Sequence, residues 1–213
     1  MNNIDFIYFL KDRLNKELPG FDAQIKMAMK FNSSLFRKFK PSETARKSSV
    51  LIILTGKSEL SVLFTLRSSK LKHHRGQISF PGGRHENGEQ YCETAIRETW
   101  EETGILVDKE CVIGKLSNLF VPPSDSLIFP YIAYIENITE PKINPDEVDE
   151  VFLKQLDLFS LESTKKIVEM NVEGIIVDTP YWDIHPTTKL WGATSMILSE
   201  LVEIYKEWKY LHQ

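Results

Sequence analysis

Three glutamates within five positions are the residues of this sequence with the clearest potential for chemistry. Glu98, Glu101 and Glu102 lie three and four residues apart, so on a helix their carboxylates converge on one side. Like charges at that spacing repel one another, and stability alone would not favour them. A divalent cation such as Mg²⁺ or Mn²⁺ would remove this conflict, because these ions prefer carboxylate, carbonyl and water oxygens. A solvated acidic helix surface is the alternative that these residues leave open.

The residues around these glutamates follow a fixed spacing. Gly83 is followed after five residues by Glu89, and after seven more by the run RETWEETGI at positions 97–105. This spacing resembles the signature of the Nudix hydrolases, and all seven fixed positions of that signature are present. The departure is Thr99, where the family usually has an aliphatic residue; threonine is β-branched and its methyl group can still pack.

The resemblance implies an α/β fold, namely a Nudix-type α/β/α sandwich with a mixed sheet, that hydrolyses a nucleoside diphosphate joined to another group. By position, the three glutamates and the carbonyl of Gly83 would hold Mg²⁺ or Mn²⁺. Arg97 would orient the carboxylates by ion pairing, and Glu89 would support the loop or a metal-bound water. A diphosphate repels a water nucleophile, so metals are needed to bridge its oxygens and to absorb charge.

The attacking water also needs a base. In many Nudix enzymes this base comes from the signature itself or from a glutamate on a later loop, and the acidic run DEVDE at 146–150 stands at a similar place before a strand. We choose Glu147, with an exposed acidic turn as an equally good interpretation. Asp125, in a loop rich in proline and serine, either shapes the pocket or completes a turn.

A second resemblance lies upstream and narrows the substrate. The run LFTLRS at 63–68 is followed by Lys72 and by FPGG at 80–83, with the spacing of the coenzyme A diphosphatase branch of the Nudix family. Phe64 replaces a leucine of that pattern, and Lys72 replaces an arginine. Lysine keeps the charge but loses the two-pronged fork of arginine, which affects affinity more than reaction type. The run WGAT at 191–194, before an expected helix, also resembles this branch.

No acidic residue lies between residues 60 and 85, whereas basic residues recur there. Such a segment favours an anion like coenzyme A, which carries a diphosphate and a 3′-phosphate; ordinary solubilising charge is the alternative. His73 and His74 have no cysteine or histidine partners at ligand spacing, so we take them first as surface residues. The expected substrate-binding residues are Arg67, Lys72, Arg75, Gly82 and Gly83.

Together the motifs predict an enzyme, a metal-dependent Nudix diphosphatase that cleaves coenzyme A or acyl-CoA into 3′,5′-ADP and 4′-phosphopantetheine or its acyl form. An ADP-ribose or dinucleotide pyrophosphatase is the nearest alternative. A non-catalytic Nudix domain that binds a nucleotide or a protein is the other alternative, although every charged position of the signature is present.

The elements that must position these residues follow from hydrophobic periodicity. We expect a helical N-terminal extension over residues 1–45 and a Nudix hydrolase domain over 46–213. Apolar spacing predicts a helix over 4–14, a stop at residues 19–20, and a short helix or irregular arm up to residue 40. The expected strands are 49–54, 60–66, 77–80, 112–119, 128–135 and 148–153, and the expected later helices are 93–103 and 194–210.

Composition limits the remaining partners. The chain has 213 residues, a net charge of -4 and 42% hydrophobic residues, which is typical of a soluble globular protein and argues against nucleic acid as the main partner. Its apolar runs are shorter than the ~20 residues that a membrane helix needs. The two cysteines, Cys92 and Cys111, suggest reduced thiols, so we expect a cytoplasmic protein that binds a small nucleotide and no membrane. A homodimer is left open.

Overall fold

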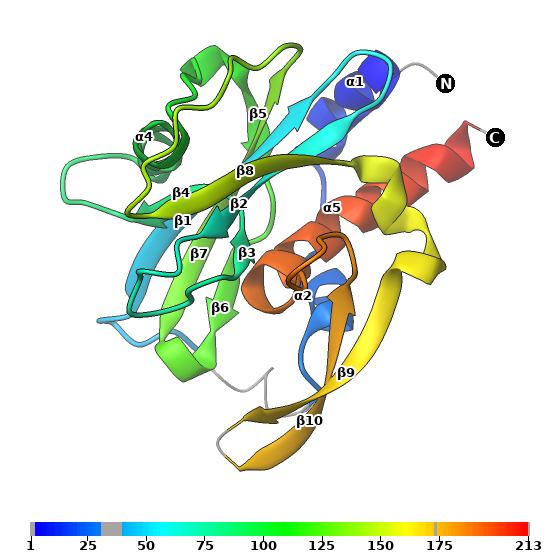
Figure 1. Cartoon of the computed structure of the whole chain (residues 1–213). Coiled ribbons are helices and arrows are strands. Elements are labelled where there is room, and N and C mark those ends of the chain that lie inside the picture. The colour runs from blue at the N-terminus through cyan, green and yellow to red at the C-terminus, as the bar shows by residue number, and fades with distance from the viewer. Residues whose placement is uncertain (1–2, 31–39, 173, 213) are drawn as a thin grey trace.

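A computed structural model describes residues 3–30, 40–172 and 174–212 (Figure 1). The helices are α1 (Asn3–Arg13), α2 (Gly20–Gln24), α4 (Tyr91–Thr103) and α5 (Gly192–Leu211), with short 3-10 helices at η1 (Ile25–Met27), η2 (Lys109–Cys111), η3 (Pro122–Ser124), η4 (Leu156–Ser160) and η5 (Glu162–Thr164). The strands are β1 (Arg46–Thr55), β2 (Ser61–Arg67), β3 (Ile78–Ser79), β4 (Gly82–Arg84), β5 (Val112–Lys115), β6 (Leu119–Val121), β7 (Ser126–Ile135), β8 (Val148–Gln155), β9 (Lys165–Val172) and β10 (Ile175–Trp182). None of the described helices combines the length and apolarity needed to cross a membrane.

The main sheet is mixed, as expected. Its strand order is β3-β2-β1-β7-β5, and β4, β6 and β8 pair with β1, β7 and β2. β1 and β7 run parallel, while β1 pairs antiparallel with β2 and β4. β9 and β10 form a separate two-stranded sheet that projects from the body of the molecule (Figure 1).

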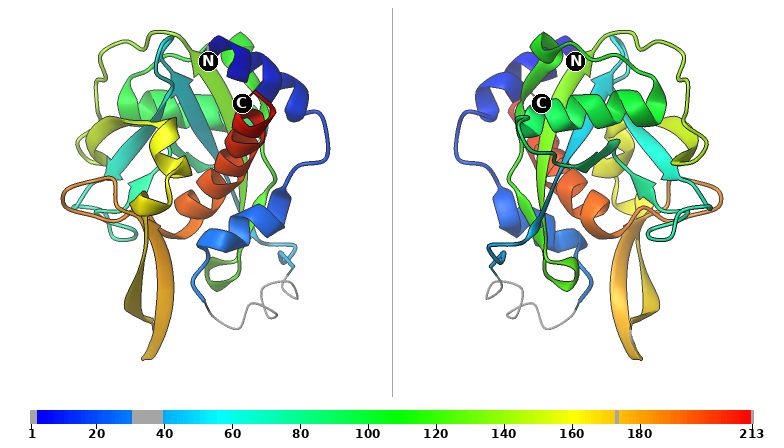
Figure 2. Two further views of the ribbon diagram at one scale, coloured as in Figure 1. Left: turned by 90° about the vertical axis from the view of Figure 1, so that its right-hand side faces the viewer. Right: turned by 90° about the vertical axis from the view of Figure 1, so that its left-hand side faces the viewer.

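The central strand β1 is apolar on both of its faces, because both faces of the sheet are covered. Leu51 and Ile53 pack with Ala95 of α4, whereas Ile52 and Leu54 belong to the larger core that contains α5. All four side chains of the strand are fully buried. Figure 2 shows α4 and α5 on opposite sides of the sheet, so the predicted three-layer α/β/α sandwich is confirmed.

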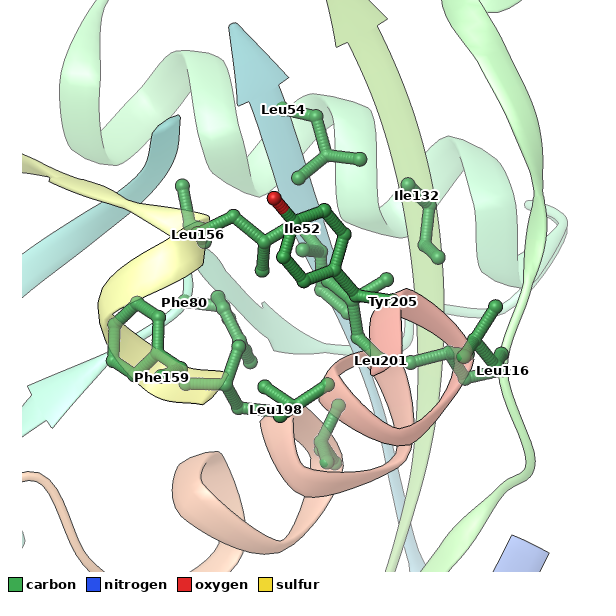
Figure 3. Packing of buried hydrophobic residues seen from close by; sticks show 14 of the residues in the cluster. Ile52, Leu54, Phe80, Leu116, Ile132, Leu156, Phe159, Leu198, Leu201 and Tyr205 are labelled. Atoms are coloured by element: carbon green, nitrogen blue, oxygen red, sulfur yellow. The ribbon is translucent and has the colours of Figure 1, made fainter. Parts of the chain in front are cut away.

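A hydrophobic core between the sheet and α5 supports one face of the sheet. Ile52 of β1 and Ile132 of β7 point toward Leu201 and Tyr205 of α5 (Figure 3). Burying one such aliphatic side chain contributes about 1.5–3 kcal/mol. The strands that carry the expected site are therefore held from the side opposite α4.

The N-terminal helix belongs to this same core. Phe6 and Leu10 are fully buried, and the Phe6 ring centre lies 5.0 Å from that of Tyr205 and 5.3 Å from that of Trp208. The boundary near residue 45 stays a prediction, but α1 packs on α5 as part of one folded unit. Of the expected arm up to residue 40, the structure describes α2, η1 and residues 28–30, and residues 31–39 lie outside the described ranges.

A buried carboxylate ties the N-terminal segment to α5. Glu200 is fully buried and accepts hydrogen bonds from the Gly20 amide (3.0 Å), from Gln24 Nε2 (3.0 Å) and from the Ser117 amide (3.2 Å). The last of these bonds also explains an error in our expectations. Residues 112–119 are not one strand, because the chain turns at Ser117 toward α5 and divides the segment into β5 and β6.

The sequence interpretation also missed two features. The short strand β4 lies inside the glycine-rich motif, where backbone pairing with β1 has no hydrophobic signature. The β9–β10 hairpin was detectable, because isoleucine and valine recur on both sides of a turn at Gly174 (φ 87°), whose amide donates to Asn171 Oδ1 (2.8 Å).

Candidate functional site

Helix α4 presents the charged residues of the motif, and both of its ends are well defined. At its start, the Gln90 amide donates to Glu93 Oε2 (2.8 Å), so this backbone N–H, which has no partner within the helix, is hydrogen-bonded. At its end, Gly104 adopts the left-handed conformation (φ 68°), and its amide donates to the Trp100 carbonyl (2.8 Å). A Cβ on Gly104 would come within 2.8 Å of Lys142 Cβ, so glycine is required for backbone and space alike.

Arg97 joins three carboxylates of the motif. Its Nε and Nη2 donate to the two oxygens of Glu89 at 3.1 and 3.0 Å, and Nη1 donates to Glu98 Oε1 (3.0 Å) and Glu101 Oε2 (2.9 Å). Nη2 also donates to the Arg84 carbonyl (3.2 Å). The expected orienting contacts of Arg97 are therefore present, and one guanidinium fixes both the helix and the loop before it.

Glu89 is an anchor within this network. Hydrogen bonding to Arg97 lowers the pKa of Glu89 to about 2, and bonds from the Glu86 amide (2.9 Å) and Thr94 Oγ1 (2.7 Å) act in the same direction. The carboxylate therefore stays ionised and accepts every hydrogen bond offered to it. This geometry suits support of the loop between Gly83 and the helix.

Glu102 lies in the opposite environment. Its side chain is 4% exposed, accepts a hydrogen bond from the Gly82 amide (3.1 Å) and lies 3.5 Å from Arg67 Nη1. Burial raises the pKa of Glu102 to about 8 despite these partners. The ionised carboxylate is thus costly here unless further positive charge lies beside it.

Glu98 and the two glycines form a close contact. Burial raises the pKa of Glu98, and a Cβ placed on Gly83 would overlap the Glu98 carboxylate. A Cβ on Gly82 (φ 152°) would overlap the Ser49 carbonyl, so the backbone of both glycines passes too close to its neighbours for any side chain. The Gly83 backbone and the Glu98 carboxylate are therefore adjacent, as a shared ligand set requires.

The three glutamates share one side of α4, but their carboxylates do not converge as expected. Glu98 and Glu101 both turn to Arg97, while Glu102 turns to Gly82 and Arg67. Among the described residues, no group of three acidic, histidine or cysteine side chains is arranged to hold a metal ion. The arrangement has an electrostatic reason, because Arg97 holds Glu98 and Glu101 together while Arg67 attracts Glu102.

The donor set nevertheless fits a hard divalent cation. Three carboxylates and the Gly83 backbone lie within one helical turn and the strand beside it, and glutamate side chains can rotate. Metal binding by these residues stays a prediction.

The structure brings Glu147 to this helix. The loop before it is bound to the end of α4, since the Asn144 amide donates to the Glu102 carbonyl (3.0 Å) and the Lys142 amide to the Thr103 carbonyl (2.8 Å). Glu147 is half-buried, and its charge helps to raise the pKa of Glu102.

The expected substrate-binding residues divide into two groups. Arg67 ends β2 and faces Glu102, so it lies in the site together with the two glycines. Lys72 and Arg75 are exposed on the following loop and, among the described residues, have no hydrogen bond or ion pair. His73 and His74 are also exposed, in agreement with their interpretation as surface residues.

Three further residues clarify the site. Thr94 was missed; its polar side chain is fully buried on α4 and contacts both Glu89 and His85 Nδ1 (3.0 Å), and a threonine on the buried side of a helix was the available signal. Thr99 is fully buried, and its hydroxyl donates to the Ala95 carbonyl (2.7 Å), so this departure from the family pattern leaves no unpaired group.

Asp125 completes a turn. Its carboxylate accepts a hydrogen bond from the Ser42 amide (3.2 Å), and its carbonyl accepts one from the Arg46 amide (2.8 Å). It thereby joins the chain before β1 to the loop between β6 and β7, and the turn interpretation accounts for its contacts.

Comparison with known proteins agrees with this fold and motif. The NUDIX domain family matches residues 45–171. Nudix hydrolase 3 from Caenorhabditis elegans is 31% identical over 194 residues, which cover 80% of this chain and 78% of the relative. The chain belongs to the Nudix hydrolase family, and that prediction is confirmed.

Two further similarities have a narrower meaning. The peroxisomal coenzyme A diphosphatase NUDT7 from Mus musculus is 35% identical over 118 residues, which cover 54% of this chain and only 50% of that relative. A crystal structure of a MutT/nudix family protein from Enterococcus faecalis has a TM-score of 0.55 at 17% identity, with 82% of this chain and 68% of the other covered. The latter supports the fold alone.

Proposed function

We propose that this protein hydrolyses the diphosphate of coenzyme A or an acyl-CoA in a reaction that requires Mg²⁺ or Mn²⁺. The products are 3′,5′-ADP and 4′-phosphopantetheine or its acyl form. A relative at 35% identity that is named as a coenzyme A diphosphatase supports this substrate class.

One contact carries the proposal. Arg67 belongs to the motif of the coenzyme A branch and Glu102 to the Nudix signature, and their side chains lie 3.5 Å apart. The two motifs therefore meet in one site. A guanidinium in that position can bind a phosphate oxygen while the carboxylates beside it hold metal.

The roles of the chain's residues follow from this arrangement. Glu98, Glu101 and Glu102, with the carbonyl of Gly83, hold the metal, and Arg97 keeps the carboxylates in position. The chemistry that a bound Mg²⁺ or Mn²⁺ would supply at these residues is Lewis-acid stabilisation of the charge that develops on the diphosphate. Glu89 fixes the loop that carries the glycines, which limits the movement of these ligands.

Hydrolysis also requires that water lose a proton. The water oxygen bonds to one phosphorus while the bond from that phosphorus to the bridging oxygen breaks, so each product keeps one of the two phosphates of the diphosphate. Glu147 accepts the proton of the water in this proposal, and its half-buried position beside the glutamates of α4 supports the choice. Arg67, Lys72 and Arg75 bind the phosphates of the substrate.

A substrate panel tests this assignment. Coenzyme A, 3′-dephospho-coenzyme A and ADP-ribose are compared at the same Mg²⁺ concentration, because only coenzyme A carries the 3′-phosphate. We expect the highest kcat/KM for coenzyme A. Equal or higher kcat/KM for ADP-ribose would exclude the coenzyme A assignment in favour of an ADP-ribose or dinucleotide pyrophosphatase.

The same panel with EDTA in place of metal tests whether the domain is catalytic. We expect hydrolysis with Mg²⁺ or Mn²⁺ and none with EDTA. Binding of a nucleotide without turnover under every metal condition would instead identify a non-catalytic binding domain.

The remaining partners and the location belong to the same proposal. We propose a cytoplasmic protein with a small nucleotide substrate and without a nucleic-acid or membrane partner, which imaging of a fluorescent fusion in its own cell would test. A homodimer through α1 would have to use the outer side of the helix, where Tyr8 is 68% exposed, because Phe6 and Leu10 pack on α5. Light scattering of Tyr8→Glu against the unaltered protein tests that contact.

A further inference from the structure

The loop between β2 and β3, residues 68–77, is here called the basic loop, and its first residues are bound to the segment that carries Glu147. The fully buried Ser68 donates its amide to the Glu147 carbonyl (2.9 Å) and its hydroxyl to Asp149 Oδ1 (3.0 Å). The Ser69 amide donates to Asp149 Oδ2 (3.0 Å). Both carboxylate oxygens of Asp149 are thus used at the base of this loop.

The other end of the basic loop is held by a segment that itself contacts β8. Thr188 Oγ1 donates to the Gly76 carbonyl (3.2 Å), and His185, in the same segment as Thr188, lies with Nε2 3.1 Å from Glu150 Oε2. Figure 2 shows the segment of residues 183–190 beside the basic loop in both views. Asp149 and Glu150 are consecutive residues of β8, so this strand binds the start of the loop directly and contacts its far end through the segment 183–190.

This support matters because two charged residues of the basic loop have no partners of their own. Lys72 and Arg75 are exposed and have no hydrogen bond or ion pair with any described residue. Their position therefore depends on the backbone that carries them. A binding group that is already in place loses less conformational entropy when the ligand arrives.

An ion pair at the same loop differs from the contacts of Asp149. Lys70 Nζ lies 3.1 Å from Asp146 Oδ1, but the two side chains are 63% and 82% exposed. Exposed pairs contribute little. Asp149 is exposed as well, but it differs because its partners are a backbone amide and the hydroxyl of the fully buried Ser68.

We propose that Asp149 is a positioning residue that fixes the basic loop, and with it the phosphate-binding charges Lys72 and Arg75, against the segment of Glu147. This inference rests on the proposed function and deepens it, because it assigns the placement of substrate contacts to a residue outside both motifs. Asp149 itself touches no reacting atom.

Steady-state kinetics with coenzyme A tests this role in four variants. Asp149→Ala is expected to raise KM about tenfold with kcat changed less than about threefold, because it removes two hydrogen bonds to a charged group. Asp149→Asn should restore KM to within about threefold of the unaltered protein, since its amide oxygen can accept from Ser69 and its NH₂ can donate to Ser68. Ser68→Ala combined with Asp149→Ala should raise KM only slightly beyond Asp149→Ala alone, because the bond between the two side chains is already lost and Ser68 adds only its longer bonds with the Pro145 carbonyl (3.3 Å) and the Lys70 amide (3.4 Å).

The matched control is Asp146→Ala, in the turn just before β8, for which we expect KM within about twofold of the unaltered protein. Equal KM values for Asp149→Ala and Asp146→Ala would overturn the inference. So would a fall in kcat and thermal stability without a change in KM, or a failure of Asp149→Asn to restore KM, because those results describe a merely structural residue.

Hydrogen exchange separates this inference from the proposed function, because it needs no substrate. The Ser69 amide and its neighbours in the basic loop should exchange faster in Asp149→Ala than in Asp146→Ala, and Asp149→Asn should restore protection. If the unaltered protein does not cleave coenzyme A, the proposed function fails, and faster exchange still supports the loop anchor. Unchanged exchange in Asp149→Ala overturns the anchor whatever the substrate is.

Discussion

Two glutamates of the site have been shifted in opposite directions by their surroundings. A guanidinium holds the pKa of Glu89 at about 2, while burial raises that of Glu102 to about 8. Glu89, which accepts two hydrogen bonds from Arg97, has a structural task, and Glu102, which is buried without enough positive charge, is suited to a cation. Glu89 is thus the anchored member of the acidic cluster, and Glu102 is the member whose ionised form a cation would stabilise.

The first prediction concerns the metal-holding charges. Glu101→Gln and Glu102→Gln should each lower kcat at saturating Mg²⁺ by about a hundredfold or more, because each loses a ligand charge at nearly constant shape. Thermal unfolding should show that both variants fold. The exposed Glu110→Gln is the control and should keep normal kcat; normal kcat in either signature variant would contradict the metal assignment.

The raised pKa of Glu102 predicts how stability varies with pH. The folded protein binds this proton more tightly than the unfolded chain does, so the stabilisation is complete below the ordinary pKa of 4.5 and is lost as pH rises toward about 8. In metal-free buffer, the free energy of unfolding should fall between pH 5 and 8, relative to Glu102→Gln, by on the order of a few kcal/mol. Urea titrations of both proteins at the two pH values measure this. If the free energy of unfolding changes with pH in the same way in both proteins, Glu102 does not keep its proton in the folded state.

Lys72 is where this chain departs from the pattern of the coenzyme A branch. If it binds a substrate phosphate equally in the ground and transition states, Lys72→Ala should raise KM for coenzyme A about tenfold to a hundredfold and leave kcat nearly unchanged. Lys72→Arg should keep or improve affinity, because a fork replaces a point charge. Using 3′-dephospho-coenzyme A identifies the phosphate, since the effect shrinks if Lys72 contacts the 3′-phosphate. A normal KM for every substrate would make Lys72 ordinary surface charge.

At the scale of elements, α4 holds the glutamates of the motif, and Gly104 ends this helix. Gly104→Ala should lower the free energy of unfolding by about 2–3 kcal/mol, because it adds left-handed strain to the contact with Lys142. Urea unfolding measures this. Gly88→Ala provides the control, since Gly88 also has a positive φ (95°) but no atom within 4 Å of an added Cβ. An equal loss of unfolding free energy in the two variants would show that backbone strain, and not the contact with Lys142, accounts for the effect.

The position of α4 could be predicted from sequence, because local signals determine it. The apolar positions, Glu93 near its start and Gly104 at its end are all close to the helix itself. The break between β5 and β6 could not be predicted, since it depends on Glu200, 83 residues away from Ser117. The local sequence pattern was thus sufficient to locate the elements. Where a long-range polar contact interrupts an element, as between β5 and β6, the local pattern was not sufficient.

The same distinction applies to the candidate site. The ion pairs of Arg97 with Glu89 and Glu101 follow from the motif, because spacing along a helix and its preceding loop sets them. The separation of Glu102 from the other two carboxylates depends on Arg67, which arrives from another strand. Anchors such as Asp149 carry no motif, and only the tertiary structure identifies them.

At the scale of the whole molecule, the site occupies one side of the sheet and the helices α1 and α5 support the other (Figure 2). The side chains of β1 alternate between the two layers. A substitution in the α5 layer therefore acts on the same strand that pairs with the glycines of the site in β4. The N-terminal segment is therefore expected to contribute stability without contributing chemistry.

Phe6 tests this division, because it lies far from the charged residues and is fully buried against Tyr205 and Trp208. Phe6→Ala should lower the free energy of unfolding by about 3–5 kcal/mol, since it removes an aromatic side chain from the core and leaves a cavity. Tyr8→Ala, on the exposed side of the same helix, should change it by less than about 0.5 kcal/mol. Urea unfolding measures both. At a temperature where both variants are folded, kcat/KM per folded molecule should stay normal in each. A selective loss of kcat/KM in Phe6→Ala would show that α1 reaches the site through the sheet and is more than a support.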